Sequence, residues 1–223
     1  MVTWKKPCAL KEVCAAVALQ TKLSYGSRRN LRYGRRQDPQ EESALDQPPA
    51  IRAFDSDIDA LIALSADDHV NRFLRRGPFA CRDDAHRFLH AYVLPHPWYR
   101  AICLSGAGVV GSIFLRPSSL AGRGELLRSA SLGYRVAGEF WGRGIATEAV
   151  RMATAAAFEE WPELERVEAI VDLENPASQR VLEKAGFTRE AVLRRYLILK
   201  GEVRDVVMTS FVSSDRASGS SKG

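Results

Sequence analysis

The sequence predicts a mixed α/β layer structure with a partly antiparallel sheet, and three observations lead to this prediction. Apolar runs separated by turn-forming residues fill the middle of the chain, as is typical of antiparallel strands. The second half alternates short strand-like runs with helix-like segments, which is typical of layered α/β folds. The chain has 223 residues, 46% of them apolar, so it can bury a core without disulfide bonds.

The first 50 residues differ from the rest in charge. They contain nine Lys and Arg against five Asp and Glu, a balance of +4 out of the chain's total of +5. The basic character therefore belongs to this leader and says little about nucleic-acid binding by the folded body. We expect residues 1–50 to be a disordered tail. An organellar transit peptide, a nucleic-acid-binding arm and an error in the gene model are the alternatives.

The cysteines and the hydropathy of the chain bear on its location. Cys8, Cys14, Cys81 and Cys103 form no C-x-x-C pair and are expected to be thiols in a reducing compartment. No apolar stretch reaches the roughly 18 residues that a membrane-spanning helix needs. These observations predict a cytoplasmic protein with no membrane association, or an organellar one if the leader is a transit peptide.

The folded body is expected to begin near Ile51 and to continue with short helices. Asp55 or Ser56 can cap the first of them, because apolar residues follow at helical spacing. A second helix is expected over 67–74, before Gly77-Pro78, and a third over 83–93.

A run of strands follows the helices. Residues 98–104 and 109–115 flank a Ser-Gly-Ala-Gly turn, which predicts a hairpin. Residues 116–128 are rich in Pro, Ser, Gly and Arg and are expected to form a loop. A further strand is expected over 129–136.

The second half alternates helices and strands. Alanines repeat on one side of 145–161, which predicts the longest helix, and 166–171 is expected to be a short strand. Residues 175–185 carry an Asn cap, a Pro at the first helical position and a Gly just beyond the end.

Two final strands are expected at 187–199 and 203–212. The Ser- and Gly-rich tail over 213–223 is expected to be disordered.

The richest motif lies between the strand 129–136 and the long helix. Its glycines, Gly142 and Gly144, allow backbone N–H groups to turn toward one point, and the helix N-terminus adds unpaired donors and partial positive charge. This pattern predicts a phosphate-binding loop to which Arg143 can add charge. A Walker loop and a dinucleotide fingerprint are excluded, because G-K-[ST] is absent and Thr147 occupies the third glycine position. An ordinary strand-to-helix turn is the alternative.

Two motifs together resemble a known superfamily. The sequence W-G-R-G-I-A-T-E-A at 141–149, followed by N-P-A-S-Q-R-V-L-E-K-A-G-F at 175–187, resembles the GNAT acyl-CoA-dependent N-acyltransferases. Within that superfamily, Trp141 and the closing strands are similar to the Rim-type branch of ribosomal-protein N-terminal acetyltransferases. The resemblance covers about 51–212. It implies a single GNAT-like domain of the α+β type, with a mostly antiparallel mixed sheet, a splayed central strand and helices on both faces.

The resemblance also implies where acetyl-CoA binds as co-substrate. The end of the splayed strand would pair with the pantetheine arm, the glycine loop would hold the pyrophosphate, and an Asn would contact the cofactor arm. The positions that match these elements are Tyr134, Arg135, Val136, Gly142, Arg143, Gly144, Ile145, Ala146, Thr147 and Asn175.

The catalytic residues are less fully matched. Many relatives use a helix Tyr to protonate the leaving thiolate, but this sequence has Leu182 there, so Ser178 is the predicted acid. Ser178 can alternatively be a first-turn helix residue that bonds locally. Relatives often carry an acid where this chain has Ser131. Glu168, on the next strand, is therefore the predicted general base, with deprotonation through water as the alternative.

These features predict an acetyl-CoA-dependent N-acetyltransferase that uses no metal and acts by direct transfer on a primary amine. A protein N-terminal amine is the expected acceptor. A small-molecule amine, such as a polyamine or amino acid, and a CoA-binding regulator without catalysis are the alternatives. Residues 95–99 lie where the family places part of its acceptor wall, so they form either an aromatic acceptor pocket or ordinary core packing. The chain would be a monomer or homodimer. His86 and His90 have metal-compatible spacing but no third ligand in view, so a solvated helix face is expected.

Overall fold

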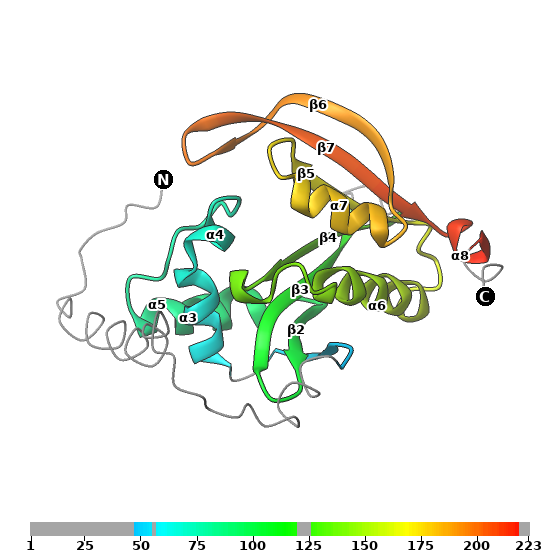
Figure 1. The fold of residues 1–223 in the computed structure, drawn as a ribbon. Coiled ribbons are helices and arrows are strands. Elements are labelled where there is room, and N and C mark those ends of the chain that lie inside the picture. Colours follow the sequence, from blue (N-terminus) through cyan, green and yellow to red (C-terminus); the bar gives the residue numbers. More distant parts are fainter. Residues whose placement is uncertain (1–46, 55–56, 120–125, 219–223) are drawn as a thin grey trace, which may run out of the picture.

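The computed structural model describes residues 47–54, 57–119 and 126–218, and within them the chain folds around one seven-stranded sheet (Figure 1). The strands lie in the order β1-β2-β3-β4-β5-β7-β6, and only β4 and β5 are parallel neighbours. They are β1 (Ala50–Ala53), β2 (Tyr99–Leu104), β3 (Gly108–Ser119), β4 (Leu126–Val136), β5 (Arg166–Asp172), β6 (Thr188–Leu199) and β7 (Glu202–Val212).

Helices precede β2 and separate the later strands. The described α-helices are α3 (Ile58–Ala66), α4 (Asp68–Asn71), α5 (Arg82–Phe88), α6 (Ile145–Glu160), α7 (Pro176–Lys184) and α8 (Asp215–Ser218). A π-helical turn, η1 (Leu89–Val93), continues α5, and a 3-10 turn, η2 (Gly138–Phe140), lies between β4 and α6.

The two faces of the sheet are covered by different helices. Ile102 on β2 packs in the larger core cluster with the buried side of α6 and α7, whereas its neighbour Ala101 packs in a second cluster with α3 and α5. Successive strand residues point to opposite faces, so these helix pairs lie on opposite sides of the sheet. The mixed fold with helices on both faces is therefore confirmed.

The parallel pair β4 and β5 separates soon after it forms. The register joins Ser129 to Arg166 and continues only to Ser131 and Glu168. Beyond that level β4 stays paired with β3 as far as Val136, while β5 stays paired with β7. The edge of β4 that faces β5 is therefore left without a strand partner, which is the splayed strand that the sequence resemblance implies.

The hairpin of β6 and β7 is long and arches over the molecule (Figure 1). Its turn, at Lys200 and Gly201, lies beside α4, where Lys200 Nζ donates to the Asn71 carbonyl oxygen at 2.9 Å. The turn of this hairpin is thereby fixed to the early helical region.

The predicted strands and helices are found, with differences at their ends. Asp55 and Ser56 lie outside the described residues, and Asp57 occupies the cap position of α3, although its carboxylate binds Arg52 instead of the helix. The second helix ends at Asn71, shorter than expected, because the Leu74 N–H turns back to the Asn71 carbonyl.

The loop predicted for 116–128 is wrong at both ends. Arg116 and Pro117 continue β3 by pairing with Ser131 and Ala130, and β4 already begins at Leu126. Residues 120–125 of that prediction lie outside the described ranges. The strands run on because each supplies the other's hydrogen bonds, which outweighs the low strand propensity of Pro and Ser.

The ends of the chain differ from the sequence expectation where they are described. Residues 215–218 form α8 in the segment expected to be disordered, and the Arg216 guanidinium lies over the Phe158 ring at 5.4 Å. Most of the leader lies outside the described residues, but Pro49 is buried, so the folded part begins before Ile51. Cys81 and Cys103 are free thiols.

Candidate active site

The glycine loop ends in a helix N-terminus with free donors. Gly142 and Gly144 have φ values of 78° and 79°, a left-handed conformation that glycine adopts without strain. Gly144 is the N-cap of α6 and offers no side chain to cap it, and the first helical bond runs from the Glu148 N–H to the Gly144 carbonyl. The N–H groups of the three residues between them therefore have no partner within the helix, as at any helix start.

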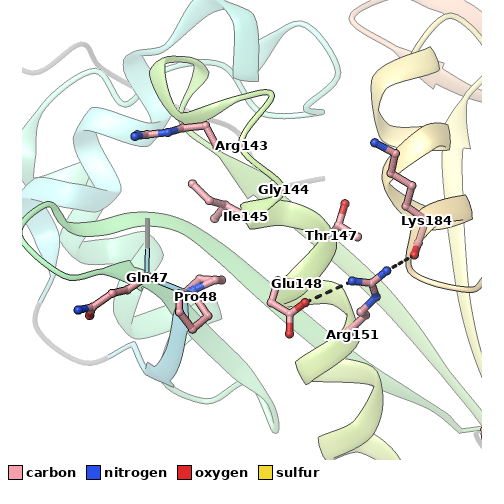
Figure 2. A pocket seen from close by; sticks show the side chains of 10 residues that line it. Gln47, Pro48, Arg143, Gly144, Ile145, Thr147, Glu148, Arg151 and Lys184 are labelled. Atoms are coloured by element: carbon pink, nitrogen blue, oxygen red, sulfur yellow. Dashed lines mark hydrogen bonds and ion pairs between the residues drawn. The ribbon is translucent and has the colours of Figure 1, made fainter. Parts of the chain in front are cut away.

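A cavity of about 570 Å³ opens at this helix start (Figure 2). We call it the loop cavity. Its described lining residues are Gln47, Pro48, Pro49, Arg143, Gly144, Ile145, Thr147, Glu148, Arg151 and Lys184.

The charge of the loop cavity is mainly positive. Arg143, Arg151 and Lys184 outnumber the single acid, Glu148. Arg151 lies between α6 and α7, paired with Glu148 at 3.4 Å and donating to the Lys184 carbonyl at 2.6 Å (Figure 2). No heavy atom lies within 4 Å of the position that a Cβ on Gly144 would occupy. Free donors, positive charge and open space together fit a diphosphate.

Trp141 anchors the loop to the end of β4. Its indole N–H donates to the Val136 carbonyl at 2.7 Å, and its ring meets His69 edge-on at 6.0 Å between centroids. The Gly138 N–H donates to Asp67 Oδ2 at 2.7 Å, and Asp67 Oδ1 also accepts from the first turn of α4. The loop is therefore held from both the sheet and the early helices.

A pair of hydroxyl groups bridges the split between β4 and β5. The Tyr134 hydroxyl lies 2.7 Å from Ser178 Oγ and also 3.2 Å from the Ser178 carbonyl oxygen. Burial raises the pKa of Tyr134 to about 12, although the Ser178 hydrogen bond opposes this, so the phenol stays neutral at physiological pH. The sequence placed Tyr134 at the cofactor through its backbone and missed this contact, which only the folding of α7 against β4 creates.

The other predicted cofactor positions have distinct surroundings. Asn175 Oδ1 accepts from the Ser178 N–H at 3.1 Å, so this oxygen caps α7. Arg135 points away from Ser178, and its Nε donates to Ser112 Oγ at 2.9 Å. Its side chain therefore faces a second cavity, and only its main chain is free to meet a cofactor arm. The Leu182 side chain is buried in the core and carries no acid group.

Glu168 lies at the level where the split begins, since it forms the last parallel pair with Ser131. Its carboxylate is 3.2 Å from Nε of Arg166, whose guanidinium also holds Glu190 at 2.5 Å. Within the described part of the chain, no hydrogen bond joins Glu168 to Ser178. The predicted base is thus part of an ion-pair network beside the split, on the sheet face opposite α6 and α7.

A second cavity, of about 270 Å³, lies against β2, β3 and β4 and the early helices. We call it the arginine cavity after four of its lining residues: Arg75, Arg76, Arg116 and Arg135. Its aromatic lining residues are Phe79, Phe88, Tyr92, His96, Tyr99 and Phe114, and Tyr134 borders it as well.

The predicted aromatic wall over 95–99 is present in part. His96 and Tyr99 line the arginine cavity, with Phe114 stacked on Tyr99 at 5.9 Å. Trp98 instead lies in the core, 2% exposed. The four arginines were not predicted, because they come from three separate segments and no local pattern joins them.

The described residues contain neither a cluster of metal-ligating side chains nor a helix that could span a membrane. No group of three His, Cys, Asp or Glu side chains comes together there, His86 and His90 included. No described helix is both long and apolar enough to cross a membrane.

Comparison with known proteins agrees with this geometry. A family model described as "Acetyltransferase (GNAT) domain" matches residues 50–188. The N-acetyltransferase YoaA of Bacillus subtilis is 36% identical over 85 residues, 38% of this chain and 48% of the relative. The chain thus spans about half the length of the curated relatives it matches.

Solved structures share the fold. RimJ of Mycobacterium smegmatis, in complex with CoA-disulfide, has a TM-score of 0.62 and 27% identity, over 75% of this chain and 83% of that one. A spermidine N-acetyltransferase of Vibrio cholerae, in complex with CoA and spermine, has a TM-score of 0.63 over 76% of this chain and 98% of that one. At 19% identity, the second likeness shows the fold alone.

Proposed function

The chain belongs to the GNAT acetyltransferase family, and from this we propose that it transfers an acetyl group from acetyl-CoA directly to a primary amine. The observation that most supports this is the position of β4, which leads into the glycine loop and also contributes Tyr134 and Arg135 to the lining of the arginine cavity. The loop cavity begins where β4 leads into α6, and Tyr134 of β4 borders the arginine cavity while its hydroxyl meets Ser178 across the split. A donor and an acceptor could therefore meet at one strand.

We propose that the glycine loop holds the diphosphate of acetyl-CoA. The free N–H groups of Ile145, Ala146 and Thr147 would donate to it, with Arg143 adding positive charge. The unpaired edge of β4 from Leu132 to Val136 would offer main-chain hydrogen bonds to the pantetheine arm. Acetyl-CoA supplies the activated thioester.

Ser178 and Tyr134 are the proposed proton donors to the departing thiolate. Both are hydroxyl groups beside the split, and they share a hydrogen bond, so one can deliver a proton and be replenished by the other. The raised pKa of Tyr134 favours its protonated form. The Leu182 side chain supplies no competing acid.

We keep Glu168 as the proposed base that removes the proton of the acceptor amine. The Arg166 guanidinium occupies one side of its carboxylate at 3.2 Å, so a relay through water to Glu168 is the form we favour. Glu168→Gln should lower turnover without changing acetyl-CoA affinity, and unchanged turnover would remove Glu168 from the mechanism.

A protein N-terminal amine is the proposed acceptor. The likeness to RimJ at 27% identity, and the sequence resemblance to Rim-type enzymes, support it. A small-molecule amine is the second candidate, and a CoA-binding regulator without catalysis the third. We also propose a cytoplasmic location, which imaging of the tagged full chain would test, with an organelle as the alternative.

Isothermal titration of the full chain with acetyl-CoA tests the cofactor assignment, and release of free thiol with added peptides tests turnover. Micromolar binding with amine-dependent thiol release is the expected result. Binding without release on any amine would favour the regulator, and absence of binding by the folded protein would remove the acetyltransferase proposal.

A further inference from the structure

The charge of the arginine cavity distinguishes among amine acceptors. Arg75, Arg76, Arg116 and Arg135 line it, and no Asp or Glu occurs among its described lining residues. A cavity of about 270 Å³ with four guanidinium groups on its walls carries a strongly positive potential.

These four arginines keep their charge uncompensated. Within the described residues none of them forms an ion pair, whereas Arg151, Arg166 and Arg204 each contact one or more carboxylates. The acidic neighbour of Arg76 is Asp84, but Asp84 already pairs with Arg87 and does not line the cavity. Because no carboxylate of the described residues pairs with these four guanidinium groups or lines the cavity, they are open to an outside anion.

Two of the arginines are held in place before any ligand arrives. The Arg76 guanidinium lies 3.9 Å from the centroid of Phe79 and 4.9 Å from that of Phe88. Arg135 is fixed by its hydrogen bond to Ser112 and a longer contact, 3.5 Å, to the Tyr99 hydroxyl. Burial and the positive charge of Arg135 lower the pKa of Arg76, while Asp84 acts in the opposite direction. An anion between them would relieve this repulsion.

His96 adds a neutral donor to the same cavity. Its Nδ1 accepts from the Trp98 N–H at 3.1 Å, which leaves Nε2 to carry the proton. Nε2 is buried without a partner in the described structure. Burial and the nearby charge of Arg116 lower the pKa of His96, so the ring stays neutral. A buried donor without an acceptor is costly, and a ligand carboxylate would satisfy it.

We propose that the acceptor is a protein N-terminus with an Asp or Glu side chain among its first residues, bound by the arginine cavity through that carboxylate. This inference rests on the proposed N-terminal acetyltransferase function. The same field favours the neutral form of the bound amine, which is the form that attacks a thioester. A polyamine brings several positive charges and would be repelled by the four guanidinium groups.

The test compares three synthetic peptides that differ only in residues two and three, which are both Glu, both Gln or both Lys. Each is titrated into the full-length protein loaded with CoA, and each is also assayed for acetyl transfer from acetyl-CoA. We expect the Glu peptide to bind at least about 10-fold more tightly than the Gln peptide, and the Lys peptide to bind more weakly still. This preference should shrink as salt is raised.

Arginine variants test whether the preference for the Glu peptide depends on the arginine cavity. Arg76→Gln and Arg116→Gln should each reduce the ratio of Glu-peptide to Gln-peptide affinity several-fold. Arg189→Gln is the matched control, because Arg189 is an exposed arginine on the edge strand β6 and lines neither cavity. In this variant the ratio of Glu-peptide to Gln-peptide affinity should not change. Acetyl-CoA titration and a thermal melt of each variant verify that the cofactor site and the fold are intact.

The outcomes separate this inference from the proposed function. Equal affinity for the Glu and Lys peptides, or a preference that Arg76→Gln and Arg116→Gln leave untouched, would overturn the inference even if peptides are acetylated. Tight, arginine-dependent binding of the Glu peptide without acetylation would support the inference and contradict the proposed reaction. A small amino acid such as glutamate, tested in parallel, would overturn the protein acceptor if it binds and reacts better than the Glu peptide.

Discussion

The two cavities differ in the groups that would bind a ligand: backbone N–H groups in the loop cavity, and side chains in the arginine cavity. In the loop cavity, the proposed diphosphate donors are backbone N–H groups at one helix start, so the single segment 142–147 supplies them, although residues 47–49, Arg151 and Lys184 also line the cavity. The arginine cavity takes its chemistry from side chains on three separated parts of the chain, 65–99, 112–116 and 134–135. A backbone site is fixed by the fold and by its glycines, whereas a side-chain site can change one residue at a time. The first should thus define the family and the second the substrate.

The strongest test of this contrast is Gly144→Glu, which would put a carboxylate where the diphosphate is proposed to bind. We expect acetyl-CoA affinity to fall by at least about 100-fold, because an unpaired negative charge would oppose the ligand's own. Isothermal titration measures the effect.

Gly201→Glu is the matched control for Gly144→Glu. Gly201 has φ 87° and open space around its Cβ position, so the substitution carries a similar backbone strain of about 1–2 kcal/mol, far from the loop. Equal loss of affinity in both variants would mean that strain, and not the diphosphate position, is responsible.

The hydroxyl pair of Tyr134 and Ser178 is tested by Ser178→Ala. We expect turnover to fall by about 100-fold while acetyl-CoA affinity changes little, because the lost hydroxyl donates a proton and does not hold the cofactor. Steady-state thiol release and titration give the two quantities. Ser213→Ala serves as control, because the Ser213 hydroxyl donates to the exposed acid Glu165, away from Ser178. Normal turnover in Ser178→Ala would remove Ser178 from the chemistry.

The same hydroxyl pair is also tested by the pH dependence of the free energy of unfolding, through Tyr134. Its pKa is raised from 10 to about 12 in the folded protein, so at alkaline pH the unfolded chain ionises first. The free energy of unfolding should therefore be unaffected below pH 10 and should fall by up to about 3 kcal/mol between pH 10 and 12. Denaturant titrations of the parent and of Tyr134→Phe at several pH values isolate this contribution. Identical pH slopes in the two proteins would contradict the buried phenol.

The smallest expected effect concerns Asp67, which joins the helix α4 to the glycine loop. Its carboxylate caps α4 and also accepts the Gly138 N–H of the glycine loop. Asp67→Ala should cost about 1 kcal/mol of stability from the lost cap and weaken acetyl-CoA binding slightly. Asp68→Ala, one residue on and without a side-chain cap role, is the comparison. If acetyl-CoA affinity is unchanged in Asp67→Ala, the contact of Asp67 with the glycine loop does not contribute to acetyl-CoA binding.

The sequence predicted the loop cavity far better than the arginine cavity. The roles of Gly142, Gly144 and the cap residue Asn175 can be predicted from short segments of sequence, because backbone conformation and capping depend on near neighbours. The contact of Tyr134 with Ser178 spans 44 positions and forms only when α7 packs on the sheet. The arginines could not be grouped for the same reason. The missed extension of β3 and β4 likewise depends on pairing across the sheet.

Direct transfer to an N-terminal amine is tested by one incubation of the full chain with acetyl-CoA and the Glu peptide, followed by mass spectrometry. A copy of the peptide whose α-amine is blocked, but which carries a lysine, is included. We expect one acetyl group on the free α-amine and none on the blocked peptide. Modification of the lysine in the blocked peptide, or no modification of either peptide by protein that binds acetyl-CoA, would contradict it.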